Sequence, residues 1–184
     1  MEIHFEFRDI EAEREKSIMR FYYWGSLIIS LALLCCVCLS SCAVTPARAD
    51  ILSIARLEIG HGESFGDNRG ADIRRYLQGR DNLPWCAGFV SYCIKQSGGG
   101  CHYTLRARDY LNMGRKVHNP KPGDLIVFSR GHGAGHVGIV EKVSGETIVT
   151  IEGNTGAFPS KVKRITYKNK PKNLLGYIRL AKAN

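Results

Sequence analysis

The hydrophobic pattern of this chain changes at Lys121-Pro122-Gly123, and this change limits the folds that the chain can adopt. Beyond it, apolar and polar residues alternate and β-branched side chains are frequent, a pattern typical of strands. Five strands are predicted, over 124–129, 136–143, 147–152, 162–167 and 176–180. Gly145 lies between the second and third segments, where we expect the turn of a hairpin. The C-terminal part is therefore predicted to form an antiparallel sheet.

Before this point, apolar residues recur at helical spacing. Helices are predicted over 50–59, 71–78, 86–96 and 105–113, and the glycine-rich segment 60–70 is predicted to be a loop. The first is expected to bury Ile51, Ile54, Ala55 and Glu58, the second Ile73, Tyr76 and Leu77. Pro84 fits the first turn of the third helix, because its missing N–H would have no partner there. That helix would begin at Cys86 and bury Phe89, Val90, Cys93 and Ile94. Helices followed by an antiparallel sheet make an α+β fold.

With 184 residues, the chain has room for one ordinary domain and a short appendage. Residues 50–184 are predicted to be the domain and hold 21 Lys and Arg against 11 Asp and Glu, a net charge of +10. Such a charge suits an anionic partner, for which nucleic acid, a membrane surface and wall polymers are alternatives. The sequence has no zinc-finger spacing and no aromatic-rich RNA motif, so nucleic acid is not expected.

Residues 21–39 carry no charge and approach the roughly 20 residues that span a bilayer. A start at Met19 would place Arg20 before this apolar segment and small residues after it, the layout of a secretory signal. Residues 1–18 hold six acidic residues against three basic ones, which contradicts the basic head of such a signal. We therefore expect residues 1–18 to be an extension that results from a mis-set start codon.

Two processing signals follow the apolar segment. Leu39-Ser40-Ser41-Cys42 resembles the bacterial lipobox, in which the cysteine is lipidated, whereas Ala47-Arg48-Ala49 has the A-x-A form of an ordinary cleavage site. An uncleaved membrane anchor is the third alternative. Residues 19–49 are thus predicted to export the domain, as a periplasmic protein, an outer-membrane lipoprotein or a secreted protein, with the N-terminal segment or lipidated Cys42 as the membrane contact.

The cysteines outside this segment are three, Cys86, Cys93 and Cys101. In an oxidising compartment, an odd number suggests one disulfide and one reactive thiol. Cys93 and Cys101 flank a flexible glycine-rich segment and are one candidate pair. Cys86 begins a predicted helix, where the N-terminal amides lower a thiol pKa and favour the nucleophilic thiolate. A lone cysteine is otherwise most often a small buried residue, a role that suits Cys93 better.

A base and a carboxylate are predicted beside this thiol. His136 opens a strand, which is a rigid mount, whereas His132 lies in a glycine-rich turn and is predicted to be a surface residue. If 136–143 and 147–152 pair as a hairpin, Glu152 lies beside His136 and can orient the imidazole, as in a catalytic triad. Asn154 can support the ring through its amide, although an asparagine before Thr-Gly is also ordinary in a turn.

Four motifs in this order resemble the cysteine, histidine-dependent amidohydrolase/peptidase (CHAP) family of cell-wall hydrolases. They are LPWCAGFVS (83–91), PGDLIVF (122–128), GHVGIV (135–140) and EGN (152–154). The resemblance implies a papain-like fold, a Cys86 nucleophile, a His136 base, and Glu152 and Asn154 as polar supports. It also implies an enzyme that cleaves N-acetylmuramoyl–L-alanine amides or stem and cross-link peptide bonds of peptidoglycan.

Trp85, Asn68 and Arg69 also resemble one branch of this family, and we expect them to contact substrate. Some relatives bind calcium before the cysteine, but Asp67, Asn68 and Asp72 are fewer oxygen ligands than such a loop requires, so neither a metal nor a cofactor is expected. Two other interpretations stay open. One is a non-catalytic wall-binding or assembly lipoprotein, and the other is an antibacterial toxin or phage-type lysin.

Overall fold

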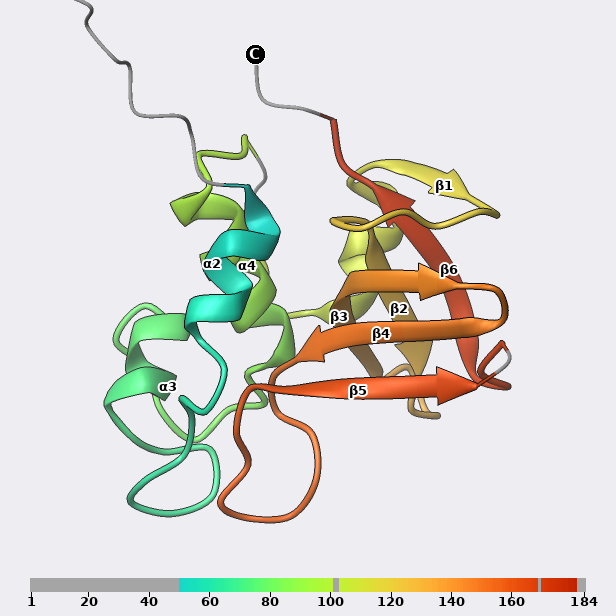
Figure 1. The fold of residues 1–184 in the computed structure, drawn as a ribbon. Helices are drawn as coiled ribbons and strands as arrows, with labels where there is room; N and C mark the ends of the chain where they lie inside the picture. The colour runs from blue at the N-terminus through green and yellow to red at the C-terminus, as the bar shows by residue number, and fades with distance from the viewer. Residues whose placement is uncertain (1–49, 101–102, 169, 182–184) are drawn as a thin grey trace, which may run out of the picture. The chain divides into compact units, whose positions relative to one another are not determined.

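The computed structural model describes residues 50–100, 103–168 and 170–181, which all lie in one compact unit (Figure 1). The predicted extension 1–18, the export segment 19–49 with Cys42, and Cys101 lie outside the described residues. Within the described ranges, no helix is long and apolar enough to cross a bilayer.

The N-terminal part is helical, as predicted. It contains α2 (Ile51–Leu57), α3 (Ala71–Tyr76), α4 (Cys86–Gln96) and a short 3₁₀ helix, η1 (Ala107–Asn112), where the sequence indicated a helix over 105–113. The Asp50 side chain caps α2 by accepting the Ser53 N–H at 2.6 Å. Leu52 and Ala55 of α2 are buried in the core, and the half-buried Ile51 and Ile54 pack against it.

The C-terminal part is one antiparallel sheet with strand order β1-β6-β2-β3-β4-β5. The strands are β1 (Arg115–Val117), β2 (Leu125–Ser129), β3 (Gly135–Ser144), β4 (Thr147–Glu152), β5 (Lys163–Lys168) and β6 (Leu174–Arg179). Five of them match the predicted segments to within two residues at each end. β1 was not predicted, because three residues are too few to show an alternating pattern. Helices followed by an antiparallel sheet confirm the α+β class.

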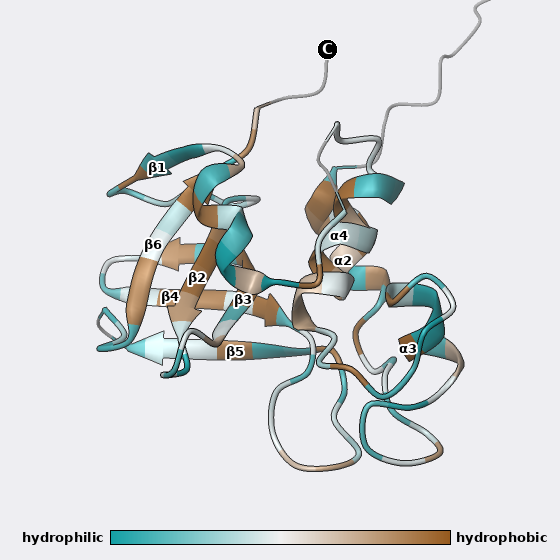
Figure 2. Cartoon of the chain, turned by 180° about the vertical axis from the view of Figure 1, so that it is seen from behind, coloured by the Kyte–Doolittle hydropathy of each residue, from teal (hydrophilic) through white to brown (hydrophobic). Residues whose placement is uncertain are grey.

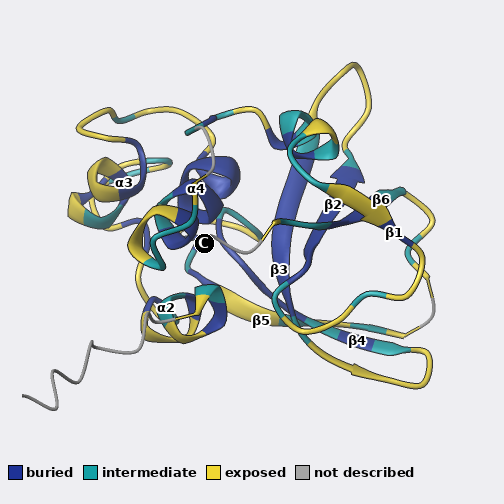
Figure 3. Ribbon diagram, turned by 90° about the horizontal axis from the view of Figure 1, so that it is seen from above, coloured by how far each residue is buried: buried dark blue, intermediate teal, exposed yellow. Residues whose placement is uncertain are grey.

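The main core lies between the helices and the sheet. Phe89, Val90 and Cys93 of α4 are fully buried there with Val137, Ile139 and Ile151 of β3 and β4. Figure 3 shows α4 largely buried, whereas α2 and α3 keep exposed faces. Figure 2 shows the apolar residues gathered on α4 and the central strands. The core thus fixes the first turn of α4 against the sheet.

Candidate active site

Cys86 lies where the sequence predicted it, at the first residue of α4 and directly after the N-cap residue Trp85. Its side chain is 5% exposed, so the thiol is in a largely dry environment. The first N–H groups of a helix have no partner inside the helix and give its N-terminus a partial positive charge. This position favours a thiolate at Cys86.

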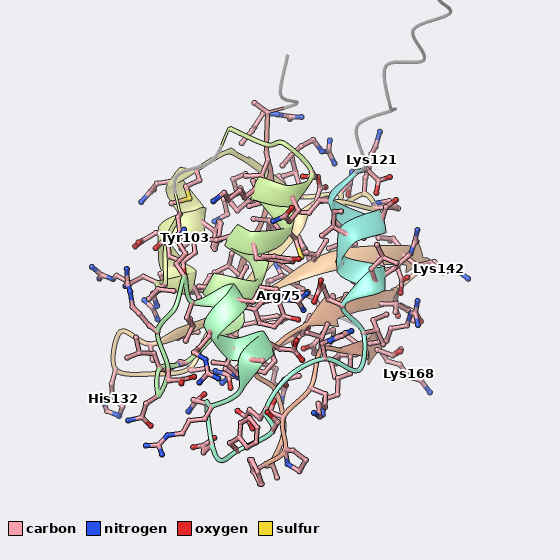
Figure 4. All side chains as sticks on the ribbon, turned by 90° about the vertical axis from the view of Figure 1, so that its left-hand side faces the viewer. Arg75, Tyr103, Lys121, His132, Lys142 and Lys168 are labelled. Atoms are coloured by element: carbon pink, nitrogen blue, oxygen red, sulfur yellow. The ribbon has the colours of Figure 1, made fainter. Side chains whose placement is uncertain are left out.

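His136 is the buried histidine of the glycine-rich segment, at 3% exposure. His132 is exposed, and Figure 4 shows it on a loop at the margin of the molecule. The His136 ring packs 5.9 Å from the ring of Phe128, its cross-strand partner on β2. A strand and an aromatic neighbour therefore hold the imidazole.

The hairpin of β3 and β4 forms as expected and joins His136 to Glu152. The pairing of Ile139 with Ile151 places Glu152 opposite Gly138. Gly138 lies two residues after His136 on β3, so Glu152 and His136 share one face of the sheet. A Cβ atom at residue 138 would lie 2.6 Å from Cγ of Glu152, so only glycine leaves room for this side chain. His136 Nε2 and Glu152 Oε2 are 2.8 Å apart and hydrogen-bonded.

Two residues that sequence reasoning missed hold the other carboxylate oxygen. Glu152 Oε1 accepts the hydroxyl of Thr150 at 2.6 Å and that of Tyr167 at 2.9 Å. Thr150 shares a face of β4 with Glu152, and this period of two is visible in the sequence. Tyr167 reaches the site only through the pairing of β4 with β5, in which it lies opposite Ile148.

Cys86, His136 and Glu152 shift one another's pKa values. Burial alone would raise the pKa of the Cys86 thiol, but interaction with His136 lowers it below its usual range. Burial would likewise lower the pKa of His136, but Cys86 and Glu152 raise it to about 9. His136, Thr150 and Tyr167 keep the pKa of Glu152 low despite its burial.

The ring orientation leaves His136 Nδ1 for the thiol. Nε2 is engaged by Glu152, whereas Nδ1 is buried without a hydrogen-bond partner among the residues described. Interaction between Cys86 and the imidazole lowers the pKa of the thiol and raises that of His136, and we take Nδ1, the ring nitrogen that Glu152 does not engage, as the atom that serves the thiol. A cysteine, a histidine and a carboxylate in this order can exchange a proton and stabilise a thiolate–imidazolium pair.

Comparison with known protein families gives a match to the CHAP domain over residues 78–154. This part of the chain matches the CHAP domain family. The matched residues include Cys86, His136, Glu152 and Asn154. The resemblance of the four motifs to this family is thereby confirmed.

The solved structures that are similar to this chain include the following two, and no curated protein sequence matches it. The peptidoglycan hydrolase RipB from Mycobacterium tuberculosis has 20% identity and a TM-score of 0.46 over 72% of this chain and 64% of its own. A lipoprotein-like NLP/P60 family protein from Staphylococcus aureus has 17% identity and a TM-score of 0.45 over 76% of this chain and 45% of its own. The chain thus spans less than two thirds of either protein.

The other predicted site residues of the CHAP domain are less closely tied to His136. Asn154 is half-buried with a φ of +55°, and within the described segments its side chain makes no hydrogen bond to His136 or Glu152. Arg69 is exposed, on the loop 60–70. Asn68 donates its backbone N–H to Glu63 at 3.0 Å. The roles of these three residues stay predictions.

Trp85, which was expected to contact substrate, is fully buried. Its ring stacks on Tyr76, with centroids 5.6 Å apart, and its Nε1–H donates to Glu63 at 3.1 Å. Gly153 closes the other side, since a Cβ atom there would lie 2.4 Å from Cζ3 of the indole. Trp85 therefore links the start of α4 to the chain that leaves Glu152.

The acidic residues considered for calcium are used otherwise. Asp72 accepts the Gly62 N–H at 3.0 Å and lies 3.2 Å from His61 Nδ1, and Asp67 is exposed. In the described ranges, no group of three or more His, Cys, Asp or Glu side chains is placed to hold a metal ion. Cys93 is a free, buried thiol whose pKa is raised well above its usual value by burial.

A cavity of about 500 Å³ lies away from Cys86 and His136. Its lining comes from the segment around Lys116 to Pro120, the β3–β4 turn at Gly145 and Glu146, and β6. None of the three residues of the Cys86–His136–Glu152 group lines it. This cavity is therefore separate from the group of Cys86, His136 and Glu152.

Proposed function

We propose that this protein is a cysteine hydrolase that cleaves amide bonds of peptidoglycan, either the N-acetylmuramoyl–L-alanine amide or a peptide bond of the stem or cross-link. The observation that carries the proposal is the alignment of Cys86, His136 and Glu152 within the part of the chain that matches the CHAP domain. RipB, one of the similar structures, is described as a peptidoglycan hydrolase.

In the first half of the reaction, the Cys86 thiolate attacks the amide carbonyl and forms a tetrahedral intermediate. In this proposal the backbone N–H of Cys86, at the N-terminus of α4, donates to the oxyanion, an interaction worth about 3–4 kcal/mol in comparable sites. The C–N bond then breaks, and His136 gives its proton to the leaving amine. The products of this half are a free amine and a thioester at Cys86.

In the second half, neutral His136 takes a proton from water, and the resulting hydroxide attacks the thioester. The C–S bond breaks, a carboxylic acid leaves, and the thiolate–imidazolium pair forms again. Glu152 stays ionised throughout, because its three hydrogen-bond partners favour the carboxylate. Its charge stabilises imidazolium in both halves.

Mass spectrometry of digested peptidoglycan tests this function. The protein is expected to produce fragments with a new amine and a new carboxyl group, and their masses identify the bond that is cleaved. Binding to peptidoglycan without new fragments would instead indicate a wall-binding protein, and cleavage between sugars would contradict the proposed chemistry.

We also propose that residues 19–49 carry the domain out of the cytoplasm, with membrane attachment through Cys42 or through the apolar segment. Peptidoglycan lies outside the cytoplasm, so the proposed substrate agrees with export. Labelling of the protein with a radioactive fatty acid in cells, and loss of the label in Cys42→Ala, would distinguish lipidation from cleavage after Ala49.

A further inference from the structure

Glu63 is a buried carboxylate outside the catalytic group. It is fully buried, and in the described part of the chain no cation forms an ion pair with it. Its carboxylate instead accepts three N–H groups, from Trp85 Nε1 at 3.1 Å, Asn68 at 3.0 Å and Ser160 at 2.7 Å. A buried carboxylate costs several kcal/mol unless it is fully hydrogen-bonded. An apolar residue at position 63 could not accept these three N–H groups, so we expect the Glu63 carboxylate to have a specific role.

The three donors come from separate parts of the chain. Asn68 belongs to the loop 60–70, Ser160 to the loop 153–162, and Trp85 precedes Cys86. The two loops also pair directly, through a β-bridge between Gly62 and Lys161 and a bond from Lys161 Nζ to the Glu63 carbonyl at 2.7 Å. Figure 1 shows the two loops side by side at the bottom of the view, the loop 60–70 below α3. Glu63 is thus the point at which both loops and Trp85 meet.

This junction lies next to the reacting groups on two sides. Trp85 is bonded to Cys86 in the chain, and Gly153, which packs on the Trp85 ring, follows Glu152. The free ends of the loops carry Phe65 and Phe158, which are 77% and 54% exposed. The loops that carry them adjoin the reacting groups through Trp85 and Gly153, so these two exposed apolar side chains are candidates for a binding surface.

We propose that Glu63 is a positioning residue that holds the loops 60–70 and 153–162 against Trp85 and so presents Phe65 and Phe158 to the peptidoglycan chain beside Cys86. The inference rests on the proposed function. Cys86, His136 and Glu152 themselves are fixed by α4, β3 and β4. Loss of the Glu63 carboxylate should therefore weaken substrate binding and spare the thiolate.

Glu63→Gln is the sharpest variant, because it keeps the shape of the side chain but turns one acceptor oxygen into an NH₂ donor. Whichever way the amide turns, its NH₂ faces either the Ser160 N–H or the N–H groups of Trp85 and Asn68. On soluble peptidoglycan fragments, we expect KM to rise about tenfold while kcat changes less than about threefold. The rate at which iodoacetamide alkylates Cys86 should stay within about twofold.

Asp67→Asn is the matched control, since it removes one carboxylate from the same loop at an exposed position. It should leave KM, kcat and alkylation unchanged. Hydrogen–deuterium exchange of the full chain supplies a readout that does not depend on activity. The Asn68 and Ser160 amides should exchange faster in Glu63→Gln but not in Asp67→Asn.

The inference would be overturned if Glu63→Gln had the same kinetic constants and amide exchange rates as Asp67→Asn. It would also be overturned if Glu63→Gln lowered kcat and the alkylation rate without a change in KM. If Glu63→Gln does not fold, Trp85→Phe removes one donor and should give the same split between KM and kcat, more weakly. If the wild-type protein cleaves no peptidoglycan, the proposed function is wrong. The role of Glu63 is then tested separately, by amide exchange and by retention of the wild-type protein and Glu63→Gln on insoluble peptidoglycan.

Discussion

Replacement of Glu152 by glutamine tests how the catalytic group is held together. The substitution keeps the side-chain volume beside Gly138 but removes the charge that faces His136 Nε2 at 2.8 Å. An amide can also present its NH₂ to the ring, which would favour the wrong tautomer of the imidazole. We therefore expect a smaller share of the thiolate–imidazolium pair and slower turnover.

The pKa of His136 gives the size of this effect. Cys86 and Glu152 together raise it from 6.5 to about 9 against the effect of burial. At about 1.36 kcal/mol per pKa unit, the two residues favour imidazolium by roughly 3 kcal/mol. If Glu152 supplies half of this, its loss costs roughly 1.5–2 kcal/mol and lowers kcat/KM by about 10–30-fold.

The assay is the rate of amine release from peptidoglycan, measured with the pH dependence of Cys86 alkylation. Glu152→Gln should lower the rate of amine release by the stated factor. It should also move the acidic end of the alkylation profile to higher pH, because a less cationic His136 lowers the pKa of the Cys86 thiol less. Glu146→Gln, at an exposed residue of the β3–β4 turn, is the matched control. A loss of less than about threefold for Glu152→Gln, with the alkylation profile unmoved, would refute the assigned role of the carboxylate.

Three further predictions concern the same group. Gly138→Ala should lower activity about as much as the loss of the Glu152 carboxylate, since the new Cβ would displace Glu152. Gly100 lies in open space, so Gly100→Ala is the control and should be neutral. Turnover and thermal unfolding of both variants check this. Tyr167→Phe removes one hydrogen bond to Glu152 and should lower kcat about 3–10-fold, whereas an unchanged kcat and pH profile would show that this hydroxyl is dispensable. In a pH series, kcat/KM should fall as the pH rises through about 9, where His136 loses its proton. The stability that His136 contributes should be complete below its ordinary pKa of 6.5 and be lost over the same rise to about 9, which denaturant unfolding at several pH values would check.

The contacts that could be predicted from the sequence are those set by local rules. Pro84 marked the start of α4 at Cys86, and the turn at Gly145 fixed the hairpin that brings Glu152 to His136. Each of these needs only one element or two neighbouring strands. The proximity of Glu152 to His136 therefore followed from periodicity and turn chemistry together with the family motifs.

The contacts that were missed depend on register or on distant segments. Tyr167 reaches Glu152 only because β5 pairs with β4 in one register, which alternation alone does not specify. Glu63 meets Ser160 across 97 residues, and nothing local distinguishes a buried glutamate from a solvated one in a polar loop. Trp85 was expected to contact substrate, and its enclosure by Tyr76, Gly153 and Glu63 was not predicted.

The central claim is that Cys86 is the nucleophile of a peptidoglycan amide hydrolase. It is tested most directly by the rate of new amine formation from purified peptidoglycan with the wild-type protein, Cys86→Ala and Cys93→Ala. Cys93 is the other cysteine among the described residues and is buried in the core. We predict that Cys86→Ala forms no amine above background while Cys93→Ala keeps most of the wild-type rate. Equal rates for Cys86→Ala and the wild-type protein would contradict the account.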